Sequence, residues 1–287
     1  MSLSTTIPQR VPAGQEPLPR LVRPESLRDA LDAARAGCTP YRGGTVLFGE
    51  FEGWQPQPSA LVDLKRVAEL HGVRWQQDEL VLGAATPLQA LLADPLVTHC
   101  LPTLQQVTGM IGNIRVRTAG SIGGNLCAGE RSSDLLTLLV ALEARVVVAR
   151  SGGSRTVTIS DFHLGHRQVD LRPDELLTEI KVPAPDEVRA AYRKVQFTGR
   201  PSLSVAAVVR AGQPDVQHVV IGAAGDRPQF ITWPVGHQPA AEAIRELAYA
   251  SDHAFGVEYK RAAAVVLVER VLQDLAAVLP ASEPPPC

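Results

Sequence analysis

Cysteine is scarce in this 287-residue chain, and its cysteines are scattered. They stand singly, at Cys38, Cys100, Cys127 and Cys287. This spacing excludes a C-x-x-C pair and the patterns typical of zinc sites, iron–sulfur clusters and disulfide frameworks. His163 and His166 form an H-x-x-H pair without an accompanying set of carboxylates or cysteines, so we interpret them as part of a polar loop. We expect no metal site here, and any cluster chemistry belongs on another chain.

Two further absences limit the partners of the chain. Lys and Arg total 28 against 30 Asp and Glu, which gives a net charge of −2. Such a balance provides no basic field of the kind that holds nucleic acid or anionic lipid. No apolar run approaches the roughly 18 residues of a membrane helix, and the N-terminal residues lack the apolar core of a secretory signal. We therefore predict a cytoplasmic protein that binds neither nucleic acid nor a membrane.

With 45% hydrophobic residues, the chain can bury the cores of about two domains. Residues 1–20, which are rich in proline, glutamine and serine, are predicted to be flexible, and residues 280–287 to be a disordered tail. Residues 21–65 are predicted to be a β-α-β arrangement. Its helix follows Ser26, has apolar residues at helical spacing and stops at Gly37.

Residues 75–165 are predicted to form a second subdomain, and the two subdomains together make a first domain over residues 21–170. In the second subdomain two short strands surround a polar turn, and helical segments are interrupted at Pro95 and Pro102. A helix then runs into a buried strand with a hairpin partner. Residues 171–187 carry prolines and acidic residues typical of a connection between domains.

Residues 188–279 show a different pattern, with three β-rich segments followed by two helices. In the last helix one face is apolar, formed by Ala264, Leu267, Val268, Val271 and Leu275. This succession predicts an antiparallel sheet with helices packed against it. The whole chain is therefore expected to have an α+β fold.

The segment VRTAGSIGGNLCAGERSSD, residues 116–134, is rich in glycine and small polar residues. Glycine loses the most backbone entropy on folding, so a run of glycines needs a reason. A tight turn explains one or two of them, whereas bare amides and hydroxyls together form a concavity suited to phosphate oxygens. A second segment, YRGGT at residues 41–45, has similar chemistry. Neither matches the G-x-G-x-x-G fingerprint or the phosphate loop, but two such loops could clamp a pyrophosphate between the subdomains.

Several segments resemble, in their order and spacing, the FAD-binding medium subunit of molybdenum hydroxylases, the group of carbon monoxide dehydrogenase and xanthine dehydrogenase. The resemblance runs from about Pro24 to Leu279. Its pieces are RGGTVL, LVDLKRVAEL, LGAAT, IRVRTAGSIGGNL, SSDL, DELLTEIKVP, YRKV and EYKRAAAVVLVERVL. It implies FAD as the cofactor. It also implies a two-part flavin domain of the vanillyl-alcohol-oxidase (PCMH) type, followed by an antiparallel sheet with helices.

The resemblance also implies a set of cofactor-binding residues. They are Arg42, Gly43, Gly44, Thr45, Val46, Leu47, Ile111, Thr118, Ser121, Ile122, Gly123, Gly124, Asn125, Asp134, Leu177 and Lys194. Residues 43–45 would bind the pyrophosphate opposite residues 121–125, and Asp134 would accept a hydrogen bond from a cofactor hydroxyl. Leu177 and Lys194 would approach the flavin, although without the resemblance Lys194 is interpreted as a surface lysine. No side chain is expected to act as a catalytic acid or base.

Three departures from the family pattern concern this site. Arg42 replaces a small alanine, which adds either bulk or a phosphate-pairing cation. Val46 replaces a polar residue and so removes one hydrogen bond to the cofactor. In the unusual segment AGERSSD, Arg131 either contacts phosphate or pairs with Glu130, and we expect the pairing.

The function implied by the resemblance is electron transfer within a heteromeric enzyme. Electrons would come from a molybdopterin large subunit, pass through an iron–sulfur small subunit to FAD, and leave to an acceptor. The alternative is a free-standing FAD-dependent oxidoreductase that oxidises a small organic molecule directly. The segment GERSSD and the loop FGEFEGWQPQPSA, whose Trp54 could cover a substrate, motivate that alternative. A third hypothesis is a scaffold subunit in which Arg42 and Val46 close the cofactor groove.

Overall fold

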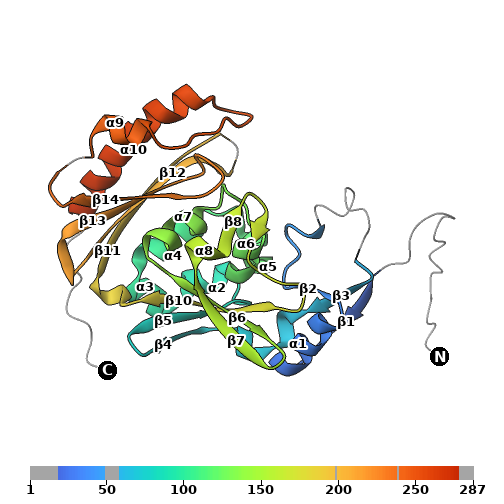
Figure 1. The fold of residues 1–287 in the computed structure, drawn as a ribbon. Coiled ribbons are helices and arrows are strands. Elements are labelled where there is room, and N and C mark those ends of the chain that lie inside the picture. Colours follow the sequence, from blue (N-terminus) through green and yellow to red (C-terminus); the bar gives the residue numbers. More distant parts are fainter. Residues whose placement is uncertain (1–18, 49–57, 198, 238, 278–287) are drawn as a thin grey trace, which may run out of the picture.

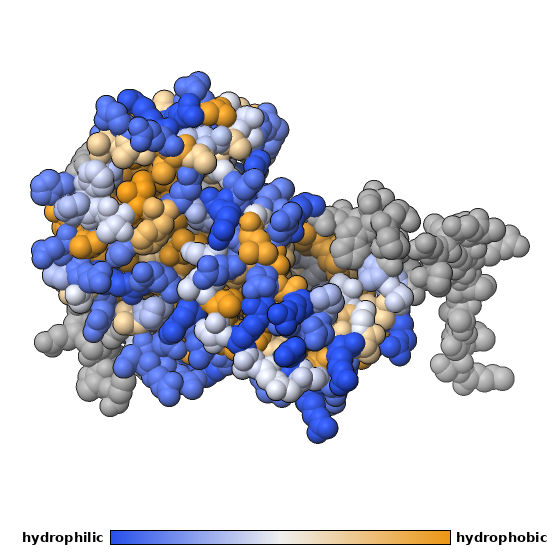
Figure 2. Space-filling model, viewed as in Figure 1, coloured by the Kyte–Doolittle hydropathy of each residue, from blue (hydrophilic) through white to orange (hydrophobic). Residues whose placement is uncertain are grey.

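The structure, a computed structural model, describes residues 19–48, 58–197, 199–237 and 239–277. Figure 1 shows two bodies: a mixed region that holds the first ten strands, and a four-stranded sheet covered by a long helix. The predictions of a flexible start and a disordered tail, and most of the Trp54 loop, fall outside the described residues. Figure 2 shows hydrophilic residues over most of one face, with apolar residues in small groups, as is usual for a protein surface.

The first sheet confirms the predicted β-α-β arrangement. Its strands are β1 (Arg20–Val22), β2 (Thr39–Tyr41) and β3 (Ala60–Asp63), with β3 in the middle and both neighbours parallel to it. Helix α1 (Leu27–Arg35) begins where the Ser26 side chain accepts a hydrogen bond from the amide of Asp29. It ends before Gly37, whose φ of +85° suits glycine. The 3-10 turns η2 (Leu64–Arg66) and η3 (Ala68–Leu70) follow β3.

The second sheet has the strand order β4-β5-β10-β6-β7. Its strands are β4 (Val73–Gln76), β5 (Glu79–Gly83), β6 (Arg145–Arg150), β7 (Gly153–Thr158) and β10 (Leu176–Pro183). The predicted polar turn joins β4 to β5 at Gln77 and Asp78, which both have positive φ. The predicted hairpin pairs β6 with β7. A small hairpin, β8 (His163–Gly165) with β9 (Gln168–Val169), follows helix α8 (Ile159–Phe162).

The segment predicted to connect the domains, residues 171–187, contains the middle strand of this sheet. Strand β10 pairs with β5 on one side and with β6 on the other, both antiparallel. Its core-facing side chains are buried: Leu176, Leu177, Ile180 and Val182. The prolines and acidic residues that indicated a link lie mainly at its ends, and the 3-10 turn η4 (Pro185–Glu187) follows it. Composition averaged over the segment concealed this short apolar strand.

Helices cover the second sheet and fill the core. They are α2 (Leu88–Ala93), α3 (Pro95–Cys100), α4 (Pro102–Gly109), α5 (Ile114–Ala119), α6 (Ile122–Cys127) and α7 (Asp134–Ala141). Pro95 and Pro102 interrupt the helical segment as predicted, because each opens a new helix, where its missing N–H costs nothing. Every residue of α7 is buried. This helix therefore lies at the centre of the molecule rather than on its surface.

The C-terminal sheet is antiparallel, with strand order β11-β12-β13-β14. Its strands are β11 (Val188–Gln196), β12 (Pro201–Arg210), β13 (Gln213–Gly222) and β14 (Gln229–Pro234). The sequence predicted three β-rich segments and missed β14, an edge strand in which no residue is fully buried. Helix α9 (Ala241–Arg245) is shorter than predicted, whereas α10 (Val257–Ala277) buries the predicted apolar face.

Helix α10 and helix α7 both contact the C-terminal sheet, α10 at β11 and β12 and α7 at β12 and β13. Tyr192, Ala206, Val208 and Val220 of this sheet belong to the same buried cluster as the α7 leucines. One hydrophobic core thus continues from the second sheet into the C-terminal sheet, and the domain boundaries remain a prediction. Within the part of the chain that the structure describes, no helix is both long and apolar enough to span a bilayer.

Candidate functional site

The first glycine-rich segment is a turn that leaves the end of β2. Gly44 has a φ of +63°, and a Cβ there would lie 2.2 Å from the Phe48 ring. The amide of Phe48 donates to the Gly44 carbonyl at 2.9 Å. Among the described residues, the amides of Gly43, Gly44 and Thr45 donate to no protein acceptor. This turn therefore presents consecutive available N–H donors.

The second segment is largely helical rather than an open loop. Helices α5 and α6 meet at Gly120, and the Ser121 side chain caps α6 by accepting a hydrogen bond from the amide of Gly124 at 3.1 Å. Gly123 packs on the end of β5, where its amide donates to the Ala84 carbonyl at 2.9 Å. A Cβ at Gly123 would lie 2.6 Å from the Cβ of Ala84. Packing thus requires a glycine at position 123, and the amides of residues 122–125 already donate to acceptors within the protein.

The two segments touch each other. The Nη1 atom of Arg42 donates to the carbonyls of Thr118, at 2.8 Å, and Ala119, at 2.6 Å. A Cβ on Gly43 would lie 1.9 Å from the Ala119 carbonyl oxygen, so only glycine permits this approach. A Cβ on Gly120 would lie 3.4 Å from the Thr45 hydroxyl. The two segments that the sequence predicted to lie on opposite sides of a pyrophosphate are thus neighbours in the fold, and the clamp itself remains a prediction.

A second group of predicted residues gathers at the start of α7. The Ser133 hydroxyl donates to the Asn125 side-chain oxygen at 2.6 Å. Next to it, Asp134 Oδ1 accepts a hydrogen bond from the Tyr192 hydroxyl at 2.7 Å and lies 2.8 Å from Lys194 Nζ. Burial, followed by the charge of Asp134, raises the pKa of Tyr192 well above its usual value. The tyrosine therefore stays protonated and donates.

Comparison with known proteins identifies the fold that carries these two groups. Residues 16–185 match the family described as the FAD binding domain in molybdopterin dehydrogenase. The chain belongs to this family. The resemblance predicted from the sequence is thereby confirmed, together with FAD as the cofactor and with the oxidoreductase class.

Individual relatives agree with this family. Over 233 residues the chain is 31% identical to the carbon monoxide dehydrogenase medium chain of Hydrogenophaga pseudoflava. The aligned residues make up 75% of this chain and 81% of that relative. Over 176 residues it is 32% identical to the glyceraldehyde dehydrogenase medium chain of Sulfolobus acidocaldarius. This alignment makes up 61% of this chain and 63% of that relative. The match to the second relative thus spans less than two thirds of its length.

A solved structure supports the architecture over nearly the whole chain. Carbon monoxide dehydrogenase from Hydrogenophaga pseudoflava, in a form that lacks the Mo-pyranopterin moiety, superposes with a TM-score of 0.80 at 27% identity. The superposition covers 91% of this chain and 98% of that one. The α+β fold with an antiparallel C-terminal sheet, expected from the sequence, is therefore confirmed.

The residues present suit the cofactor of this FAD-binding family. The turn of residues 43–45 offers amides, and the Nε atom of Arg42 is buried with no hydrogen-bond partner among the described residues. Amides and a guanidinium are the donors that phosphate oxygens prefer. The opposing segment supplies an exposed Gly124 and a half-buried Asn125. The candidate site therefore has hydrogen-bond donors on the side of the first turn and small, polar residues on the side of the second segment.

Other predicted residues of this FAD-binding chain differ in burial, and two of them, Val46 and Leu47, belong to the turn itself. Leu177 and Ile122 are buried in the main core, and Val46, Leu47 and Ile111 are half-buried. Lys194 is not the surface lysine that its sequence context suggests, because its side chain is 9% exposed and paired with Asp134. Tyr192, two residues earlier on the same face of β11, was missed by the sequence analysis. The shared segment YRKV was the signal that could have found it.

The expectation that Arg131 pairs with Glu130 is wrong. Arg131 Nη1 lies 3.3 Å from Asp226 Oδ1, on the loop between β13 and β14. Glu130 instead pairs with Arg167 at 3.0 Å and with Arg200 at 2.9 Å. The two residues lie in a turn closed by the hydrogen bond from the Ser133 amide to the Glu130 carbonyl at 3.0 Å, and each side chain meets a different partner. Both residues join the FAD-binding region to loops of the C-terminal sheet.

Proposed function

We propose that this chain is the FAD-carrying electron-transfer subunit of a heteromeric molybdenum-dependent dehydrogenase or oxidase. The observation that carries the proposal is the contact between Gly43 and Ala119 in a chain of this family, which brings the donor-rich turn against the second segment. When bound, FAD supplies the capacity to take up and release electrons one or two at a time.

The role of the chain's own residues is to bind and orient. Gly43, Gly44 and Thr45 would hold the pyrophosphate through their amides, with Ser121, Gly124 and Asn125 opposite them. The second segment's contribution would come from side chains and from the exposed face of Gly124, because the amides of residues 122–125 are engaged within the protein. Val46 would add only apolar contact.

Asp134, Lys194 and Tyr192 would serve the other end of the cofactor. The carboxylate holds the lysine ammonium in a buried position, where a fixed positive charge stabilises negative charge on a nearby ligand. In this role Asp134 acts mainly through Lys194, although it also remains the proposed acceptor for a cofactor hydroxyl. Leu177 would contribute apolar surface from the core.

The partners proposed for the chain are an iron–sulfur small subunit and a molybdopterin large subunit. The support is that relatives of this chain are a medium chain and an FAD-binding subunit, and such names belong to enzymes built from several chains. The alternative, a free-standing flavoprotein that oxidises a small molecule, differs in requiring turnover without partners. The cytoplasmic location predicted from the sequence stays a prediction.

The test begins with the visible absorption spectrum of the chain purified alone, followed by denaturation and identification of any released flavin. Release of FAD supports the proposal, and a colourless protein that takes up no added FAD contradicts it. Co-expression with the neighbouring genes' products and affinity capture then distinguish the two functions. Recovery of molybdenum- and iron–sulfur-containing subunits supports electron transfer, whereas turnover of a small substrate by the isolated chain supports the alternative.

A further inference from the structure

Arg42 is the residue in the first turn whose bonding is least complete. It follows β2 and stands immediately before Gly43. Its Nη1 atom makes two hydrogen bonds, to the carbonyls of Thr118 and Ala119. Within the described part of the chain, the buried Nε atom has no partner, and no hydrogen bond is formed by Nη2. Since a guanidinium carries five N–H donors, most of them remain for another group.

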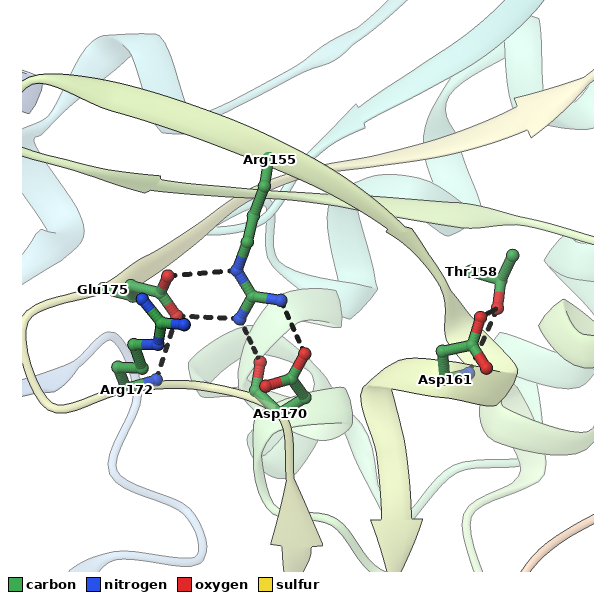
Figure 3. A network of polar contacts seen from close by, with 6 residues as sticks. All are labelled: Arg155, Thr158, Asp161, Asp170, Arg172 and Glu175. Atoms are coloured by element: carbon green, nitrogen blue, oxygen red, sulfur yellow. Dashed lines mark hydrogen bonds and ion pairs between the residues drawn. The ribbon is translucent and has the colours of Figure 1, made fainter.

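A comparison with Arg155 shows what a purely structural arginine looks like in this protein. As Figure 3 shows, the guanidinium of Arg155 is enclosed by Glu175 and Asp170. Its Nε and Nη2 atoms donate to Glu175 at 3.0 and 2.8 Å, and its Nη1 and Nη2 atoms donate to Asp170 at 2.5 and 2.7 Å. Each nitrogen has an acceptor, and two carboxylates balance the charge. Among the described residues, no carboxylate bonds to Arg42 and its guanidinium is only partly hydrogen-bonded.

The charge of Arg42 is also incompletely balanced. Burial lowers the pKa of Arg42, and the nearby charge of Asp63 acts in the opposite direction. However, the Asp63 carboxylate is bonded to the amide and ammonium of Lys65, and no ion pair joins it to Arg42 among the described residues. A partly buried cation without a bonded anion is costly, and binding of an anion removes that cost.

Arg42 directly precedes residues 43–45, so its unbonded Nη2 and the available amides of these residues belong to the same turn, and we call these groups together the donor surface. We infer that Arg42 is a diphosphate-binding residue: one nitrogen joins the two loops, and the remaining donors bind the diphosphate of FAD. This inference rests on the proposed function and deepens it. It makes the site selective for a dinucleotide, because a flavin without the diphosphate cannot use this donor surface.

The test compares flavins that differ in their phosphates. Apoprotein of the wild type and of Arg42→Ala is titrated with FAD, FMN and riboflavin, with flavin fluorescence as the readout. Loss of charge-assisted hydrogen bonds should weaken FAD binding about 10-fold or more, while riboflavin affinity stays within about 2-fold. Arg42→Lys should fall between the two, because it keeps the charge but loses the fork geometry. Inorganic pyrophosphate should compete with FAD better in the wild type than in Arg42→Ala.

The matched control is Arg28→Ala, which removes an exposed arginine of α1 and leaves FAD affinity unchanged. Thermal unfolding midpoints of the apoproteins show whether each variant folds. An equal loss of affinity for FAD and riboflavin would mean that Arg42 only holds the loops together, and it overturns the inference. Unchanged FAD affinity in Arg42→Ala also overturns it, with the proposed function intact. Wild-type protein that binds no flavin defeats the proposed function itself.

Discussion

The two glycine-rich segments are similar in sequence, but their backbone amides are bonded differently in the structure. In the first, the amides of residues 43–45 donate to no acceptor in the described part of the chain, and Gly43 allows the backbone to approach Ala119. In the second, Gly123 is packed against Ala84, and the neighbouring amides are satisfied by the protein. The comparison teaches that a glycine motif identifies a place where backbones come close. A ligand can bind there only where backbone amides have no acceptor within the protein.

The largest expected effect is that of Gly43→Ala. The added Cβ would meet the Ala119 carbonyl at 1.9 Å and force the two loops apart. We expect FAD affinity to fall at least about 100-fold, or about 3 kcal/mol, as measured by titration of the apoprotein. The control is Gly153→Ala, where an added Cβ has no neighbour within 4 Å. Wild-type affinity in Gly43→Ala would refute the assignment of this turn to the site.

Gly123→Ala should act on folding rather than primarily on the ligand. Its Cβ would lie 2.6 Å from the Cβ and 2.7 Å from the carbonyl oxygen of Ala84, so the helix must shift from β5. Overpacking of this kind costs about 1–3 kcal/mol of unfolding free energy, which urea unfolding of the apoprotein measures. In Gly124→Ala the nearest contact is 3.1 Å to Ser121 Oγ, so we expect a smaller loss. The reverse order would contradict the different roles assigned to these neighbours.

The ion pair between Arg155 and Glu175 gives a pH-dependent prediction. Hydrogen bonds from Arg155 lower the pKa of Glu175, so this carboxylate stabilises the fold above its unfolded pKa of about 4.3, and the contribution is lost as pH falls. Glu175→Gln should therefore cost about 1–3 kcal/mol at neutral pH. The gap between wild type and variant should close as the pH falls below about 4. Urea unfolding across this range checks the sign, and a gap that stays constant would count against it.

The smallest expected effect concerns Tyr192. Tyr192→Phe removes the hydrogen bond to Asp134 and should cost about 0.5–1.5 kcal/mol. Because the folded pKa is raised, this contribution is complete below the unfolded pKa of about 10 and declines as the pH rises above it. Alkaline difference absorbance should show that Tyr192 ionises above the usual tyrosine pKa of about 10. Tyr259→Phe, at a half-exposed site, is the control and should leave stability nearly unchanged.

Much of the local structure could be predicted because its causes are local. The Ser26 cap, the apolar spacing in α1 and the glycine after it specify that helix within a few residues of sequence. The same holds for Pro95 and Pro102, which divide a long helical segment, and for the apolar face of α10. The order of the shared segments was sufficient to indicate the family and, with it, FAD.

What the sequence left open depends on which distant segments meet. No local pattern shows that residues 176–183 lie in the middle of a sheet, because that requires β5 and β6 on both sides. Nor does it show that Arg131 pairs with Asp226 or that Lys194 is buried against Asp134.

The sequence by itself determined helices α1 and α10, the hairpins β4–β5 and β6–β7 and the family of this chain, since caps, turn residues and periodicity act over a few residues. Only the tertiary structure decided which donors remain available for a cofactor, at Arg42 and in the turn that follows it. The physical reason is that a donor is used only when an acceptor lies beside it in the fold. The acceptors that bind Arg42 belong to residues more than 70 positions away in the sequence.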